Sequence, residues 1–125
     1  MQQIETIEEF ETKVDEGELT VIHFMTYPSM KFTHGWWVMV EPEMFIRPVG
    51  TKDKLTLVFA HNIPLAPEKY YFRSRNEQLR FTLFFPALPK GTTHIDIIET
   101  LNKANNPFNF YNVSMEKIRS GALKI

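Results

Sequence analysis

Apolar residues occupy every second position of the segment Leu79–Phe85, and this alternation constrains the fold more than any other feature of the chain. A period of two predicts a β-strand that buries one face, here the face of Phe81, Leu83 and Phe85. Pro86 follows directly. Because proline has no N–H group to donate to a neighbouring strand, we expect pairing to end at this residue.

The residues after this strand predict a corner rather than a catalytic loop. Pro89 and the pair Lys90–Gly91 favour a turn, and the apolar run Ile95–Ile98 has the length and composition of another strand. We therefore expect the chain to cross here from one sheet to the other. Leu88 lies between the two prolines of the corner and is expected to fill the end of the core.

The rest of the chain repeats short apolar or β-branched runs that are separated by Pro, Gly, Asn and Asp. Strands are expected at residues 19–25, 36–40, 44–47, 55–59, 70–72 and 108–113. In the first of these, Ile22 and Phe24 share one face, and His23 lies on the other as a partly buried, hydrogen-bonded imidazole. Residues 10–14 fit a strand and also fit helical spacing. We favour the strand, and residues 1–9 stay open between helix and strand.

This succession of about seven to nine short strands, without a convincing long helix, predicts an all-β fold built as an antiparallel β-sandwich. At 125 residues, of which 43% are hydrophobic, the chain can form one domain with a sizeable core. We expect this single domain to span residues 1–125, with its core at about residues 10–113. Residues 114–125 are expected to be a tail or linker, either a short helix or a frayed end.

Charge is unevenly distributed, although the formal net charge is only −1. Residues 1–20 carry seven acids and one lysine, so the remaining residues carry eight acids and thirteen bases. This asymmetry fits a solvated acidic face or an acidic segment that lies across a basic surface, and we favour the solvated face. No apolar run approaches the ~20 residues of a membrane span. The acidic N-terminus also lacks the apolar stretch of a signal peptide.

The residue types that could act in catalysis or bind a metal do not form a known catalytic or metal-binding motif. The absence of cysteine excludes thiol nucleophiles and Cys-ligated metals, and the four histidines stand singly. Asp96 and Glu99 are three residues apart and so lie on opposite faces of a strand, which argues against a glycosidase pair. Asp96 is instead expected to accept backbone hydrogen bonds near the preceding turn. With no GxSxG motif or glycine-rich phosphate loop either, we expect no catalytic residue, no cofactor and no metal.

The candidate binding surface consists of four aromatic residues, namely Trp36, Trp37, Tyr70 and Tyr71. Because adjacent strand residues face opposite sides, one tryptophan can fill the core while the other lies on an outer face. There it can stack on a sugar, anchor a protein partner or be covered by a loop. Arg73, Arg75 and Arg80 follow the tyrosines, but a pI near 6.4 and the lack of an RNA-binding motif argue against nucleic acid.

The segment FTLFFPALPKGTTHIDIIE, residues 81–99, resembles the central segment of small β-sandwich domains from exported proteins of anaerobic gut bacteria. In that family the domain often precedes a TlpA-like thioredoxin domain. The similarity extends, as a pattern, over about residues 10–113, whereas Ala87 stands where the family commonly has a second consecutive proline. The resemblance implies an immunoglobulin-like sandwich of unassigned function, without known catalytic residues, that serves as an accessory or interaction module.

We favour a non-catalytic accessory or interaction domain whose partner is another protein or another domain of a larger chain. The alternative is a small-molecule or glycan-binding sandwich that uses an exposed tryptophan as its platform. A third hypothesis is a hydrolytic enzyme with loop residues such as His34, His61 and Asp53. The resemblance implies a periplasmic or cell-envelope location for an exported fragment, and a complete chain implies the cytoplasm. The sequence specifies neither the ligand nor the oligomeric state.

Overall fold

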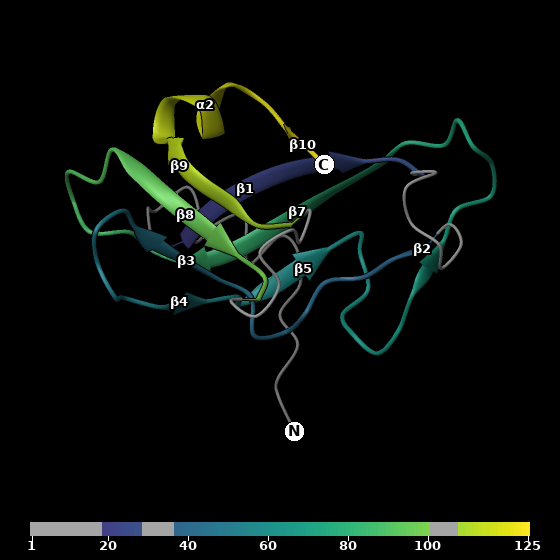
Figure 1. The fold of residues 1–125 in the computed structure, drawn as a ribbon, viewed down its shortest axis with the longest axis horizontal. Helices are drawn as coiled ribbons and strands as arrows, with labels where there is room; N and C mark the ends of the chain where they lie inside the picture. Colours follow the sequence, from purple (N-terminus) through teal and green to yellow (C-terminus); the bar gives the residue numbers. More distant parts are fainter. Residues whose placement is uncertain (1–18, 29–36, 101–107) are drawn as a thin grey trace.

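The computed structural model describes residues 19–28, 37–100 and 108–125, and these form an all-β fold with one short helix (Figure 1). The strands are β1 (Leu19–Thr26), β2 (Trp37–Val38), β3 (Phe45–Pro48), β4 (Leu55–Thr56), β5 (Phe59–His61), β6 (Tyr70–Tyr71), β7 (Leu79–Pro86), β8 (His94–Ile98), β9 (Phe110–Ser114) and β10 (Leu123–Lys124). The helix is α2 (Met115–Ser120). The described residues form ten strands, slightly more than the seven to nine predicted. Several of the ten contain only two residues, which are too short to be recognised in the sequence. The predicted strand at 10–14, the open segment 1–9 and Trp36 lie outside the described residues.

The strands are arranged in two four-stranded sheets and one two-stranded ribbon. The first sheet has the order β10-β1-β7-β5, the second has the order β4-β3-β8-β9, and β2 pairs with β6 in the ribbon. All pairs within the two sheets are antiparallel except one, since β10 runs parallel to β1 and places Leu123 beside Phe24. The prediction of a purely antiparallel arrangement is therefore wrong at this edge.

The two four-stranded sheets share one hydrophobic core. The first sheet contributes Phe24, which is fully buried and stacks on Phe81 of β7 with 5.2 Å between ring centroids. Phe24 also meets Phe110 of the second sheet at 6.0 Å, so aromatic rings of both sheets are in contact. On β7, Phe81, Leu83 and Phe85 are all at most 2% exposed, which confirms the burial predicted from their alternation.

Within the described ranges, three connections pass directly from one sheet to the other, namely β4 to β5, β7 to β8, and β9 through α2 to β10. The predicted corner is confirmed, because β7 ends its pairing at Pro86 in the first sheet and β8 begins in the second. Leu88, within this corner, is half-buried and packs against the core. The predicted strand at 55–59 is divided into β4 and β5 by another of these crossings. Its middle residues bond to different sheets, with Leu57 N–H donating to Met44 O and Val58 N–H donating to Phe84 O, each at 2.8 Å.

The last twelve residues contain the short helix that was one of the two alternatives expected there, but they pack against the sheets rather than forming a tail or linker. The Ser114 hydroxyl caps α2 by accepting the Lys117 N–H at 3.1 Å. Ile118 of the helix and Leu123 of β10 are both nearly fully buried in the common core. Apolar residues at these positions secure the segment, because each removes its side chain from water only when the helix and strand lie against the sheets.

His23 differs from its predicted environment. It is exposed rather than partly buried, since the outer face of β1 is open at this point, and its Nδ1 lies 2.8 Å from Thr82 Oγ1 on β7. Among the described residues, no helix has the length and apolar character needed to cross a membrane.

Candidate functional site

The two-stranded ribbon brings together two of the four predicted surface aromatics. In the antiparallel pairing of β2 with β6, Trp37 lies directly opposite Tyr71, and Val38 lies opposite Tyr70. Directly opposed residues project to the same side of a ribbon, and successive residues of a strand alternate between sides. The ribbon therefore has one side with Trp37 and Tyr71 and another with Val38 and Tyr70.

The side with Trp37 and Tyr71 faces outward. Tyr71 is 65% exposed, the largest value among the exposed large hydrophobic residues of the described part. Trp37 is half-buried, and Lys69 places its Nζ 4.5 Å from the centroid of the Trp37 ring. This distance is typical of a cation–π contact, which fixes the ammonium group over one face of the indole. We call Trp37, Lys69 and Tyr71 the ribbon surface.

The opposite side of the ribbon belongs to the core. Val38 is 8% exposed, and Tyr70 packs against the core cluster as a half-buried residue. The Tyr70 ring meets the edge of Phe72 with 5.5 Å between centroids. The structure thus separates Tyr70 from the surface predicted for it, because Tyr70 and Tyr71 are neighbours in one strand and must point to opposite sides.

The hydroxyl of Tyr70 is held by the loop that follows β6. It donates a hydrogen bond to the Glu77 carboxylate, whose other oxygen accepts the Arg73 N–H at 2.6 Å. The bond to Glu77 is the main reason that the pKa of Tyr70 is raised, and burial adds to it. The same bond, together with the Arg73 N–H, lowers the pKa of Glu77. Both ionisable groups are therefore engaged in fixing the β6–β7 loop beside the ribbon surface.

The segment that contains Lys69 and β6 is rich in bases. Residues 68–80 contain four bases and two acids, and one of the acids, Glu77, is already engaged by Tyr70 and Arg73. Lys69, Arg73, Arg75 and Arg80 are all exposed. Sequence analysis identified the three arginines but missed Lys69, because its place over Trp37 depends on the pairing of two strands that are distant in the chain.

The residues of the predicted hydrolytic site are distributed over the fold. His61 is exposed on β5 of the first sheet, and Asp53 lies in the turn between β3 and β4, where its N–H lies 3.4 Å from Thr51 Oγ1. His34 lies outside the described residues. Within residues 19–28, 37–100 and 108–125, no three His, Asp or Glu side chains are grouped so that they could hold a metal ion.

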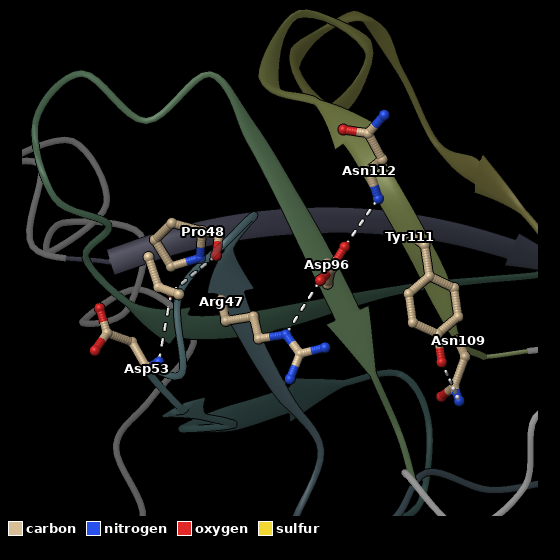
Figure 2. Close-up of polar contacts among 8 residues, drawn as sticks. Arg47, Pro48, Asp53, Asp96, Asn109, Tyr111 and Asn112 are labelled. Atoms are coloured by element: carbon tan, nitrogen blue, oxygen red, sulfur yellow. Dashed lines mark hydrogen bonds and ion pairs between the residues drawn. The ribbon is translucent and has the colours of Figure 1, made fainter.

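The two carboxylates that were considered as a pair have separate structural partners. Asp96 accepts hydrogen bonds from Arg47 Nε at 3.1 Å and from the Asn112 N–H at 2.9 Å (Figure 2). The backbone donor thus comes from β9 rather than from the preceding turn, which corrects the prediction. Glu99 accepts the Glu41 N–H at 3.2 Å. The ribbon surface is therefore the arrangement that best matches the predicted binding residues.

Comparisons of the chain with models of protein families, with curated proteins and with solved structures gave no match.

Proposed function

We propose that this chain is a non-catalytic interaction domain that binds another protein, or another domain of a larger chain, through the ribbon surface. The observation that carries this proposal is the direct pairing of Tyr71, 65% exposed, with Trp37 on the outward side of the ribbon. Tyrosine and tryptophan are enriched among the residues that dominate binding energy in protein interfaces. Each offers a large apolar area at a small cost in side-chain entropy.

Lys69 and the basic segment that follows it in the sequence indicate the chemistry of the partner. Lys69 lies over Trp37, and the arginines at positions 73, 75 and 80 follow it in an otherwise sparsely acidic segment. A partner with carboxylates beside apolar side chains would complement both the charge and the aromatic area. We therefore propose an acidic segment that also contains apolar residues as the class of partner.

The glycan-binding alternative receives less support from this geometry. A sugar ring stacks on the open face of an aromatic side chain. One face of Trp37 already carries the Lys69 ammonium group at 4.5 Å, so stacking there would first require displacement of the lysine. Tyr71 alone offers a smaller platform.

The architecture supports an interaction role in a second way. We propose that the two four-stranded sheets, with their common core and the connections that cross between them, form an immunoglobulin-like sandwich. Such a scaffold supplies a rigid base from which a short ribbon can present side chains. The perturbed pair Tyr70 and Glu77 then has a structural role, since each holds the other next to that ribbon.

Selection from a displayed library of random peptides against the intact chain tests this proposal. We expect the selected peptides to combine Asp or Glu with apolar residues, and to lose about tenfold or more in affinity with Tyr71→Ala or Trp37→Ala. Lys69→Glu should weaken the acidic peptides in particular. The matched control is Tyr111→Ala, because Tyr111 is also exposed, at 54%, but lies on β9.

Two results would contradict the proposal. One is a set of selected peptides whose affinity is unchanged by Tyr71→Ala and Trp37→Ala. The other is a library that yields no enriched peptide, combined with a shift of the tryptophan fluorescence on titration with oligosaccharides. If Trp37→Ala abolishes that shift, the result favours the glycan hypothesis.

A further inference from the structure

The corner between β7 and β8 lines an open depression of about 430 Å³. Its wall consists of Pro48, Val49, Lys90, Gly91, Thr92, Thr93, His94 and Asn112. Pro48 belongs to β3 and Asn112 to β9, the two strands that flank β8 in the second sheet. Figure 2 shows these two residues on either side of β8, so the depression lies over the beginning of that strand.

Hydrogen bonds fix the wall of this depression. Pro89 O accepts both the N–H of Thr92, at 3.3 Å, and its hydroxyl, at 2.7 Å, which closes a tight turn. Gly91 adopts a φ of +85° within this turn, a conformation that glycine reaches without steric cost. On either side, Val49 N–H donates to His94 O and Met115 N–H donates to Thr93 O. The loop is therefore tied to β3 and to the start of α2, and its shape is set before any ligand arrives.

The wall offers side-chain donors from Lys90 and Asn112, whereas the Thr92 hydroxyl already donates to Pro89 O. Lys90 offers an ammonium group, and no Asp or Glu is among the described residues that line the depression. The Thr93 hydroxyl and His94 Nδ1 lie 3.1 Å apart. Asn112 uses its backbone N–H for Asp96, but its side-chain amide points away from Asp96 and has no hydrogen-bond partner in the described part of the chain (Figure 2). Such a wall favours a ligand that brings negative charge and several acceptor oxygens.

We propose that this depression binds the phosphoryl group of a small phosphorylated molecule. A phosphoryl group offers three acceptor oxygens, which suit the Lys90 ammonium group together with the side-chain amide of Asn112 on the same wall. Among the described residues that line the depression there is no arginine, the residue whose planar fork matches a carboxylate in bidentate fashion. This site is separate from the ribbon surface and does not depend on it.

Titration of the intact, isotopically labelled chain with inorganic phosphate tests the proposal by amide NMR, with sodium chloride at equal ionic strength as the reference. We expect saturable shifts for Lys90–His94 and Asn112 with phosphate, and much smaller shifts with acetate. Lys90→Gln should weaken phosphate binding by about tenfold, as expected for loss of a charged hydrogen bond. Lys124→Gln is the control, because Lys124 is equally exposed but lies on β10.

Asn112→Gly separates the role of the side chain from that of the backbone. Asn112 has a φ of 55°, which glycine also adopts readily, so the variant removes the amide group and keeps the fold. We expect it to weaken phosphate binding by a few fold while the thermal midpoint stays close to that of the unmodified chain. The proposal is overturned if the shifts do not saturate, if acetate produces them equally, or if Lys124→Gln reduces binding as much as Lys90→Gln.

Discussion

The Oδ1 atom of Asp96 accepts the backbone N–H of Asn112 at 2.9 Å, across a β-bulge between β8 and β9. Ile95 pairs with Val113 and Ile97 pairs with Phe110, so two residues of β9 lie opposite the single residue Asp96. Asn112 is the bulged residue with a left-handed φ of 55°. The carboxylate therefore satisfies an N–H group that the bulge removes from the regular ladder.

Asp96→Ala is expected to destabilise the chain, because Asp96 is only 9% exposed and has two charge-assisted hydrogen bonds, one to the Asn112 N–H and one to Arg47 Nε. We expect the free energy of unfolding, measured in urea, to fall by about 2–3 kcal/mol. Asp53→Ala is the control at an exposed acid and should change stability by less than about 0.5 kcal/mol. Equal stabilities for the two variants would mean that the bulge does not need its carboxylate.

The hydrogen bond between Tyr70 and Glu77 predicts a pH-dependent contribution to stability. The pKa of Glu77 is lowered from 4.5 in the folded chain, so its contribution is present above pH 4.5 and is lost as the pH falls through the folded value. The pKa of Tyr70 is raised from 10.0, so its contribution is present below pH 10.0 and is lost as the pH rises through the folded value. The bond therefore stabilises the chain between these limits.

Tyr70→Phe tests this window because it removes only the hydroxyl. We expect the urea midpoint of the variant to lie below that of the unmodified chain near neutral pH, and the difference to shrink at both extremes. Tyr71→Phe, at the exposed neighbouring position, should show no such difference. A gap between Tyr70→Phe and the unmodified chain that stays constant from acid to alkaline pH would rule out the hydrogen bond as its source.

The corner after β7 also makes a stability prediction. Leu88 packs half-buried against the core, so Leu88→Asp introduces a carboxylate where apolar side chains meet. We expect a loss of about 2–3 kcal/mol in the free energy of unfolding. Ala87→Asp is a control one residue away at an exposed position, and it should be close to neutral. If both variants unfold at the same urea concentration as the unmodified chain, Leu88 does not close the end of the core.

Local pattern was sufficient to predict much of the fold. The alternation in Leu79–Phe85, the stop at Pro86 and the corner that follows all depend on neighbouring residues, and each is present in the structure. Strand pairing is different, since it joins segments distant in the sequence. The opposition of Trp37 and Tyr71 and the parallel pairing of β10 with β1 arise from such pairing, and neither leaves a local signal.

The β-bulge at Asn112 also could not be predicted from local sequence, because it depends on how two strands pair. Asparagine tolerates a left-handed φ more readily than most residues, but it does so at many turns, so Asn112 in the sequence does not indicate a bulge. The pairing of Asp96 with it becomes apparent only when β8 and β9 are aligned. The depression likewise combines residues from β3, the β7–β8 corner and β9. The sequence of the corner alone therefore could not predict a binding site there.

Leu123 provides the test of whether the C-terminal segment is part of the folded unit. It is 2% exposed and pairs with Phe24 through the parallel β10, next to the backbone bond from Ile125 N–H to Met25 O at 2.9 Å. Leu123→Ala should therefore cost about 2–4 kcal/mol in the free energy of unfolding, as expected for a truncated core leucine. Lys124→Ala, at the exposed adjacent position, should be nearly neutral. A neutral Leu123→Ala would restore the interpretation of residues 114–125 as a tail, because a side chain that contributes no burial energy cannot hold the segment against β1.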